Sequence, residues 1–416
     1  MTTSITARTA ASTLAPITQQ LAQQRDQIES WFVQQWQQTP PPIYASVDVR
    51  DSGFKLAPVD TNLFPAGFNN LSAEDQLHAS TAAYDIINQL IPGCQRILLM
   101  AENHSRNVYY LENLAHLQLI LQAAGFSVKL GTLTGENHRV SSASGASLSL
   151  ETPTRSANTI QLAGFVPDLI LLNNDLAEGV PSLLTGISQT ILPPMQLGWH
   201  QRLKSQHFQQ YNQVCQRFAS AIHLDPWVLN SLFNRCTAVD FMARTGENCL
   251  LVKTTQLLEA ITQKYQSYHL TQKPYVVIKA DAGTYGMGIL TVETAEAIAQ
   301  LSRKKRSHMM RTKGNRAIQQ VILQEGVSSV TRWQETVAEP VIYLFGSKVI
   351  GGFYRTHATR NAQENLNTPG MQLHPFHFGK INQLTQYALI QNSNASQLYA
   401  YGVVARLAAL AATGEV

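Results

Sequence analysis

From residue 73 to residue 172 the apolar positions alternate between helical spacing and short strand-like runs. The pattern predicts helices over 73–90 and up to residue 124, a spacer rich in Ser, Thr and Gly over 134–154, and strands over 96–100, 127–133, 159–165 and 169–172. Such alternation is typical of a parallel sheet covered by helices, whose ligands bind beyond the carboxyl ends of the strands. Polar clusters at 102–107 and 173–175 follow two of these strand ends.

The patterns on either side of this region differ from it. A glutamine-rich segment with a partial apolar face predicts a helix over 17–38 that three prolines end. A strand over 43–49 and a long irregular segment of charged, amide and aromatic residues over 50–70 follow. Beyond residue 273 we expect a helix over 294–301, a strand over 318–323 and longer paired strands. We therefore expect α/β and α+β parts, divided as an N-terminal helix and loop segment (1–72), an α/β parallel-sheet domain (73–215) and a third domain (216–416).

One pair of these later strands is a hairpin. The runs 341–345 and 348–355 are joined by Gly346 and Ser347, a two-residue turn of a favoured kind. Alternation along the second strand places Arg355 on the same face as Gly351, which has no side chain. That arrangement suits an arginine that holds a transferring phosphate, although an exposed arginine at a strand end would have the same pattern.

Composition excludes several classes of protein. The 416 residues are 44% hydrophobic and 14% charged with a net charge of +4, values of a globular chain without a broad basic surface for nucleic acid. No run of 18 apolar residues predicts a membrane span. Neither a secretion signal nor a C-x-x-C motif is present, so we expect a cytoplasmic protein with buried free thiols and no disulfide framework.

The segment 275–289 contains the most informative chemistry. Four apolar residues lead to Lys279, and Gly283, Gly286 and Gly288 follow. A lysine at a strand end can reach a phosphate, and glycines let backbone N–H groups approach the phosphate oxygens. The pattern predicts a nucleoside triphosphate site in which Lys279, Asp281 and the three glycines take part.

The order of these residues separates the possible nucleotide sites. A P-loop places its lysine after the last glycine and follows it with Ser or Thr. A dinucleotide fingerprint runs G-x-G-x-x-G into a helix. The segment fits neither pattern. A glycine-rich turn beside a surface lysine remains the alternative without a ligand.

Two later segments extend the candidate site. The strand predicted over 318–323 ends on Gln324 and Glu325, whose amide and carboxylate can bond an adenine edge and ribose hydroxyls. The loop 359–370 contains Glu364, Asn365 and Asn367 before a Pro-Gly turn. Magnesium prefers such hard oxygen ligands, although Asn-rich turns also form for local reasons.

Taken in order, these segments resemble a bacterial glutamate–cysteine ligase family of the ATP-grasp-related type. The resemblance covers nearly the whole chain, and its motifs lie at 54–70, 102–104, 172–175, 279–288 and 351–355. It implies a pre-ATP-grasp-like domain followed by an ATP-grasp-like domain. It also implies Mg²⁺- and ATP-dependent joining of the glutamate γ-carboxylate to the cysteine amine through an acyl phosphate, the first step of glutathione synthesis.

The resemblance also suggests roles for individual residues. Lys279 would contact the α and β phosphates, Arg355 the transferring group, and Gln324 and Glu325 the adenosine, with Lys279 and Arg355 as the catalytic pair. The amino-acid substrates need opposite charges, for which the candidates are Arg50, Asp60, Asn62, Asn69, His104 and Arg106.

The metal site departs from the family pattern. Many ATP-grasp enzymes have a late Glu-x-Asn pair, whereas this chain has Asn365-Leu366-Asn367. Glu364, Asn365 and Asn367 are the candidate Mg²⁺ ligands, with Asp281 and Glu339 as alternatives. A ligase for another amine or a protein substrate, and a nucleotide-binding module without turnover, remain open. The expected partners are small molecules, and a homo-oligomer is possible.

Overall fold

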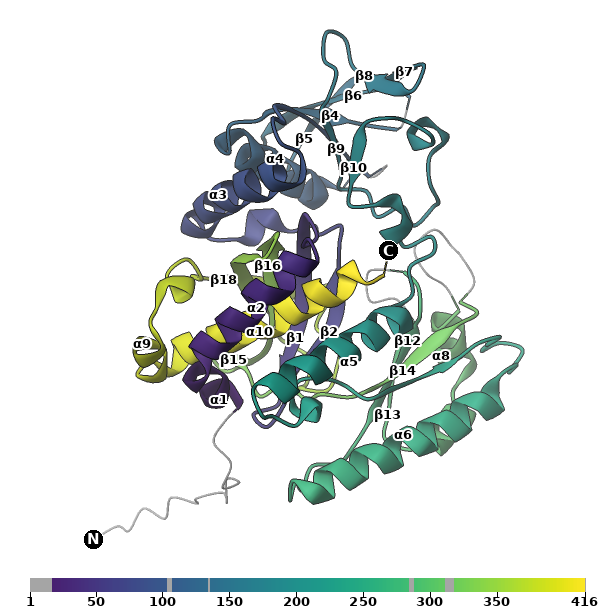
Figure 1. The fold of residues 1–416 in the computed structure, drawn as a ribbon. Coiled ribbons are helices and arrows are strands. Elements are labelled where there is room, and N and C mark those ends of the chain that lie inside the picture. The colour runs from purple at the N-terminus through teal and green to yellow at the C-terminus, as the bar shows by residue number, and fades with distance from the viewer. Residues whose placement is uncertain (1–16, 103–106, 134, 284–287, 311–317, 416) are drawn as a thin grey trace.

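The computed structural model describes residues 17–102, 107–133, 135–283, 288–310 and 318–415. Within these residues the chain forms a mixed α/β fold with three larger sheets and one small hairpin (Figure 1). No helix in this described part has the length and apolar character needed to cross a bilayer.

The first sheet confirms the predicted parallel arrangement. Its strands run in the order β10 (Thr190–Leu192), β9 (Leu169–Leu172), β3 (Arg96–Met100), β4 (Ser127–Gly131), β6 (Ser147–Glu151) and β5 (His138–Ser141). All neighbours are parallel except β5 and β6. Helices α3 (Ala73–Leu90) and α4 (Val108–Ala123) pack their apolar side chains with those of β3 and β9 in one core cluster.

Two predictions for this region were wrong. The predicted strand 159–165 is only β8 (Thr159–Gln161), which pairs with β7 (Thr154–Ser156) outside the parallel sheet. The predicted spacer 134–154 instead contains β5 and β6. Leu148 and Leu150 are buried between exposed serines, so this short period-two pattern is that of a half-buried strand.

The second sheet joins the two ends of the chain. Its order is β18 (Met371–Phe376), β17 (Lys348–His357), β16 (Thr336–Phe345), β1 (Tyr44–Asp51) and β2 (Leu56–Asn62), and β15 (Arg332–Trp333) also pairs with β16. Phe345 pairs with Lys348, which confirms the predicted hairpin, and Gly346 has a φ of 57° that favours glycine. The predicted boundaries near residues 72 and 215 stay predictions.

The prediction of irregular backbone over 50–70 was wrong for β2. The sequence of this strand contains Pro58 and the polar run Asp60-Thr61-Asn62, so it lacks the apolar pattern that predicts a strand. Proline is tolerated because β2 is the end strand of the sheet. On its open side there is no neighbouring strand to which a backbone N–H group would donate. The segment that was expected to be a loop therefore holds Asp60 on a regular strand.

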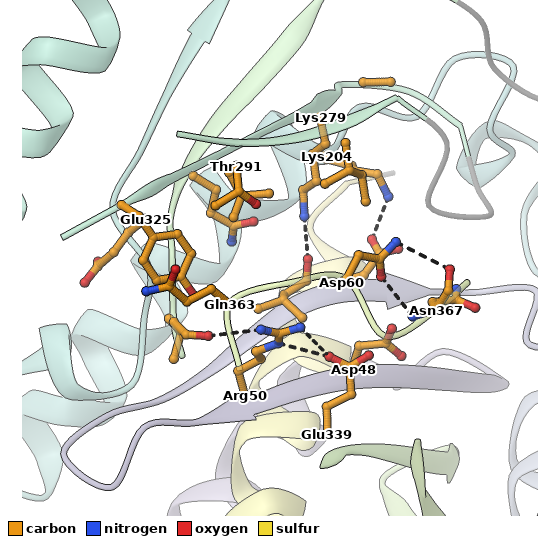
Figure 2. A pocket seen from close by; sticks show the side chains of 18 of the residues that line it. Asp48, Arg50, Asp60, Lys204, Lys279, Thr291, Glu325, Glu339, Gln363 and Asn367 are labelled. Atoms are coloured by element: carbon orange, nitrogen blue, oxygen red, sulfur yellow. Dashed lines mark hydrogen bonds and ion pairs between the residues drawn. The ribbon is translucent and has the colours of Figure 1, made fainter. Parts of the chain in front are cut away.

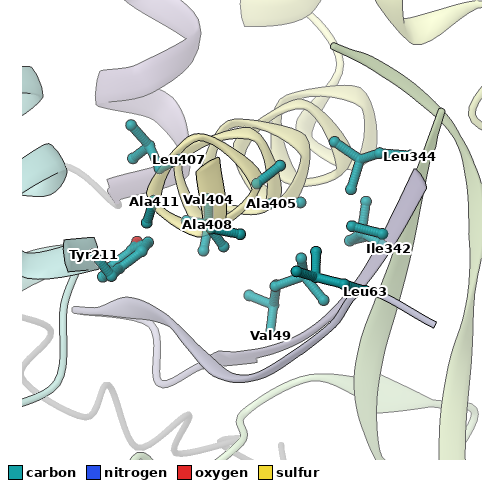
Figure 3. Close-up of a cluster of buried hydrophobic side chains, with 14 of the residues drawn as sticks. Val49, Leu63, Tyr211, Ile342, Leu344, Val404, Ala405, Leu407, Ala408 and Ala411 are labelled. Atoms are coloured by element: carbon teal, nitrogen blue, oxygen red, sulfur yellow. The ribbon is translucent and has the colours of Figure 1, made fainter. Parts of the chain in front are cut away.

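Helix α10 (Ser393–Thr413) lies across this sheet, and its side chains pack with those of the sheet in one hydrophobic cluster (Figure 3). Every residue from Ala395 to Ala412 except Gln397 is buried, and a helix that is apolar all round requires such a position. Its alanines allow close approach to the sheet, where Ala405 and Ala408 lie over Val49. Around it pack α1 (Ile17–Gln23), α2 (Arg25–Gln38), α5 (Lys204–Ala221) and α9 (Gln386–Ile390).

The third sheet is antiparallel, with the order β11 (Phe233–Cys236), β14 (Val321–Glu325), β12 (Val276–Ala280) and β13 (Ile289–Val292). Helix α6 (Glu247–Ser267) covers one face, where Leu257 and Ile261 share a core with Val276 and Ile278. Two short helices follow, α7 (Glu296–Ala299) and α8 (Arg303–His308). The other face of this sheet borders a cavity.

The prediction of four free thiols was wrong for two of them. Cys236 on β11 and Cys249 in the first turn of α6 form a disulfide, with their Cα atoms 6.2 Å apart. Cys94 and Cys215 are free and buried, as predicted. The 13-residue separation of the bonded pair carries no sequence signal, because only the packing of α6 against β11 brings the two cysteines together.

Candidate active site

A cavity that is open to solvent lies between the third sheet and the strands β1, β2 and β16 (Figure 2). Its walls carry both charged and apolar side chains. Three groups of residues line it: the open face of β12–β14, an ionic cluster on β1 and β16, and the loop around residues 363–367.

Strand alternation explains the first wall. Tyr275, Val277 and Lys279 face the cavity, whereas Val276 and Ile278 face α6. The register places Val277 between Thr291 and Gln324 on the neighbouring strands, so both also line the cavity. The wall therefore runs from an apolar and amide end at Val277 to a cationic end at Lys279.

Lys279 is buried at the cationic end. Its Nζ donates to the carbonyl oxygen of Val59 at 2.5 Å. Burial lowers the pKa of Lys279, and although the nearby Asp60 carboxylate opposes this effect, the pKa is about 8. A cation that is already desolvated interacts strongly with an anion that enters the cavity.

A second lysine stands beside it. Lys204, the first residue of α5, places its Nζ 2.6 Å from Asp60 Oδ1 and 4.2 Å from the centre of the Trp199 ring. Burial raises the pKa of Asp60, but Lys204 and Lys279 outweigh this and hold it at about 2, so the carboxylate is ionised. Two lysines and one carboxylate thus meet at one end of the cavity (Figure 2).

The floor of the cavity is an ionic cluster of four side chains, of which three are buried and Asp48 is partly exposed. Arg355 NH1 lies 2.8 Å from Asp48 and 2.9 Å from Glu339, and Arg50 NH2 lies 2.9 Å from Glu339. Burial raises the pKa of Asp48, and Arg355 acts against this increase. Asp48, Arg50 and Glu339 line the cavity, whereas Arg355 lies behind them with its charge paired to two carboxylates.

Arg50 also holds the loop around residues 363–367, which forms another side of the cavity. It donates to the carbonyl oxygens of Ala362 at 2.8 Å and Glu364 at 2.5 Å, in addition to its contact with Glu339. These bonds fix the loop whose Gln363, Asn365 and Asn367 line the cavity. The Arg50 guanidinium is thus bonded to Glu339 and to this loop. We infer that Arg50 holds the loop in place.

Glu325 and Gln324 differ in whether their polar atoms are already hydrogen-bonded within the protein. The Glu325 carboxylate accepts from Lys55 Nζ at 2.6 Å, Trp227 Nε1 at 3.2 Å and the Leu232 backbone N–H at 2.9 Å. In contrast, Gln324 is 2% exposed, and its Nε2 finds no hydrogen-bond partner among the described residues. Of the two, Gln324 has the free donor at the cavity wall.

The structure describes fourteen of the predicted site residues. Eight of them line the cavity: Lys279, Gly283, Gln324, Glu325, Arg50, Asp60, Asn365 and Asn367. Arg355 lies beneath it. Five others are outside the lining, namely Asp281, Gly288, Asn62, Asn69 and Glu364. His104, Arg106 and Gly286 lie outside the described residues.

Those outside the lining have other contacts. Asp281 accepts from Ser205 and pairs with Arg235 at 3.0 Å, which docks the start of α5 beside the glycine loop. Glu364 points to Arg360, 2.9 Å away. Asn62 and Asn69 bond to residues of their own loop.

Sequence reasoning missed several residues of the cavity. Alternation on the predicted strands would have included Tyr275 beside Lys279, and Asp48 beside Arg50. No such signal exists for Lys204, which is 144 residues from its partner Asp60.

Comparisons with known proteins identify the family of this chain. A model of the glutamate–cysteine ligase family matches residues 18–416. The crystal structure of a candidate gamma-glutamylcysteine synthetase from Methylobacillus flagellatus KT is 44% identical, with a TM-score of 0.88, over 97% of this chain and 98% of that one. The comparison with curated proteins gave no match.

Two further structures are only distantly similar and carry no argument here. A glutathione synthetase-like effector from Globodera pallida is 10% identical over 86% of this chain and 79% of its own, with a TM-score of 0.38. D-alanyl-alanine synthetase A from Vibrio cholerae is 14% identical over 76% and 81%, with a TM-score of 0.34. The extent of the family match, together with the 44% identical structure, shows that this chain belongs to the glutamate–cysteine ligase family.

Proposed function

We propose that this protein uses ATP to join the γ-carboxylate of L-glutamate to the amine of L-cysteine in the cavity beneath β12, the first step of glutathione synthesis. The observation that carries the proposal is the family match over residues 18–416, together with a cavity in which Lys279 and the start of the glycine loop lie opposite carboxylate and amide side chains. We further propose that β11–β14 and the strands across the cavity form an ATP-grasp-like nucleotide site.

The wall of β12 supports one orientation of the nucleotide. Tyr275 and Val277 offer an apolar surface for the adenine ring, and the free Nε2 of Gln324 can donate to a ring nitrogen. The phosphates then extend toward Lys279 and Gly283. Glu325 supports this wall through its bonds to Lys55 and Trp227.

The chemistry needs positive charge at the γ-phosphate. The glutamate γ-carboxylate attacks the γ-phosphorus, the bond to ADP breaks, and an acyl phosphate forms. The deprotonated cysteine amine then attacks the acyl carbon, and inorganic phosphate leaves. Lys279 and Lys204 line the cavity in this region, whereas Arg355 lies behind the lining, so we assign Lys204 the contact with the transferring group that the sequence suggested for Arg355.

The residues present fit a magnesium ion that is held partly by the substrate. Asp48, Glu339, Asn365 and Asn367 offer hard oxygen atoms at the cavity. The described residues contain no group of three His, Cys, Asp or Glu side chains placed to hold a metal by themselves. This agrees with Mg²⁺ sites that use one or two carboxylates plus phosphate oxygens. The ion would neutralise charge on the phosphates.

Release of ADP, measured with glutamate and a panel of amines, tests this function. Turnover that requires both glutamate and cysteine would support the proposal. Turnover only with another amine or with a protein carboxyl terminus would indicate a different ligase. ATP binding without turnover on any panel member would indicate a binding module. The cytoplasmic location and the homo-oligomer stay predictions.

Gln324→Leu is expected to raise the KM for ATP about tenfold with little change in kcat, because a hydrogen bond to the adenine is lost. Steady-state ADP release at varied ATP measures both constants. Gln319→Leu, at an exposed position just before β14, is the matched control. An unchanged KM in Gln324→Leu would show that the adenine does not meet this amide.

The affinity for ATP should fall as the pH rises above about 8. The pKa of Lys279 is about 8, so this group loses its proton there, and only the protonated amine attracts phosphate. ATP binding therefore takes up a proton above that pH. Calorimetry with a non-hydrolysable ATP analogue from pH 7 to 10 measures this slope. Lys279→Arg stays charged and should flatten it, and an equal slope in both proteins would contradict the assignment.

A further inference from the structure

A buried ionic cluster lies where the chain leaves α10. Helices α10 and α5 pack together there (Figure 1). The Glu415 side chain is 5% exposed and accepts two bonds from Arg202, at 2.7 Å from Nε and 3.0 Å from NH2. His207 Nδ1 lies 2.6 Å from the same carboxylate. Burial raises the pKa of Glu415, but Arg202 and His207 outweigh this and hold it at about 2. The carboxylate is therefore ionised at neutral pH.

The imidazole in this cluster acts as a neutral donor. Burial lowers the pKa of His207, and the Glu415 charge only partly opposes this. Nδ1 therefore carries the proton and donates to Glu415. His207 and Arg202 thus both direct their donors at one carboxylate.

The cluster joins the two elements that carry the lysine and the carboxylate of the cavity. Arg202 NH1 donates to the carbonyl oxygen of Thr61 at 2.7 Å, next to Asp60 on β2. His207 lies about one turn beyond Lys204 on α5. Glu415 therefore ties the first turn of α5 to the residue after Asp60.

The opposite side of that turn is tied to β12. The Lys204 backbone N–H donates to the Asp281 carbonyl oxygen at 2.7 Å, and Ser205 bonds the Asp281 carboxylate through both its N–H and its hydroxyl. Asp281 follows Lys279 by two residues. The first turn of α5 thus lies between two buried carboxylates, and the Lys204 side chain extends from it to Asp60.

We propose that Glu415 is a positioning residue for Lys204. By holding Arg202 and His207, it fixes the start of α5 against β2 and directs the lysine toward Asp60 and the transferring phosphoryl group. The proposal rests on the proposed function for the role of Lys204. Holding a long flexible cation in place before the reaction removes an ordering cost from the chemical step.

A double-mutant cycle tests this proposal by steady-state ADP release. Glu415→Gln is expected to lower kcat/KM for ATP about tenfold, because a Lys204 ammonium group that is out of position stabilises the transferring group poorly. In a Lys204→Ala background the same change should have no further effect, because the group that it positions is absent. A general loss of structure would instead lower activity in both backgrounds.

Glu29→Gln is the matched control. Glu29 accepts two bonds from Arg406 and one from Tyr399, on helices away from the cavity, and its loss should leave kcat/KM unchanged. If Glu415→Gln does not fold, Arg202→Lys keeps the charge, loses the two-pronged contact and provides the same cycle. Wild-type kcat/KM in the variant that folds, or an effect that adds fully to Lys204→Ala, would overturn the proposal.

A crystal structure of the same variant separates this proposal from the proposed function. If the wild-type protein does not join glutamate to cysteine, the function fails, but the position of Lys204 can still be observed. Displacement of Lys204 Nζ from Asp60 in the variant supports the positioning role. An unchanged distance of 2.6 Å overturns it, whatever reaction the enzyme performs.

Discussion

Replacing Lys279 with alanine is expected to lower kcat/KM for ATP by about 10²–10³-fold, since one fixed donor at a developing negative charge contributes about 2.7–4 kcal/mol. The fold should persist, because the amine has no carboxylate within ion-pair distance among the described residues and its bond is to one backbone carbonyl. Steady-state ADP release and thermal unfolding of the same preparation measure the two effects.

Lys348→Ala is the control for this variant. Lys348 is a lysine on β17 with a half-exposed side chain that pairs with Asp85 away from the cavity, so its removal should change neither measurement. A Lys279→Ala enzyme with wild-type kcat/KM would show that the phosphates lie elsewhere. A variant that loses activity only because it unfolds would appear in the thermal measurement.

Arg355→Met is expected to lower the free energy of unfolding by about 3 kcal/mol, because it leaves the largely buried Asp48 without its arginine partner, whereas Glu339 keeps Arg50. Urea unfolding followed by fluorescence measures the change. Activity should fall with stability, since Asp48 and Glu339 line the cavity. A loss of kcat at wild-type stability would instead support the direct contact with phosphate that the sequence suggested.

The pH dependence of this variant has a definite sign. Burial raises the pKa of Asp48 even with Arg355 present, and removal of the arginine charge should raise it further. The folded state then binds a proton that the unfolded state releases above about pH 4, so the destabilisation should grow as the pH rises and shrink toward acid. Asp48→Asn in the Arg355→Met background should recover part of the lost stability, and no recovery would mean that Asp48 is not the unpaired group.

Local patterns were sufficient for much of the fold. The bounds predicted for α3, β3 and β9 agree with the structure, because an apolar face at helical spacing or a fully buried run of four or five residues has few other ways to be covered. The Gly346-Ser347 turn and the strand that carries Lys279 were likewise predicted from residues that are neighbours along the chain. Eight of the site residues named from the sequence line one cavity.

The errors come from contacts between distant residues. β2 was missed because its Asp60 faces a cavity whose other walls are far away in the sequence. Arg355 was assigned to phosphate because its two carboxylate partners could not be located from the chain. The Cys236–Cys249 disulfide and the Lys204–Asp60 pair were missed for the same reason.

By itself the sequence determined α3, β3, β4 and β9 of the parallel-sheet region, the strand that carries Lys279 and the resemblance to a ligase family, since each depends on neighbours along the chain. Only the tertiary structure decided which charges are free to meet a substrate. That outcome depends on burial and pairing across hundreds of residues, as when β1 pairs with β16 and brings Asp48 and Arg50 to Glu339.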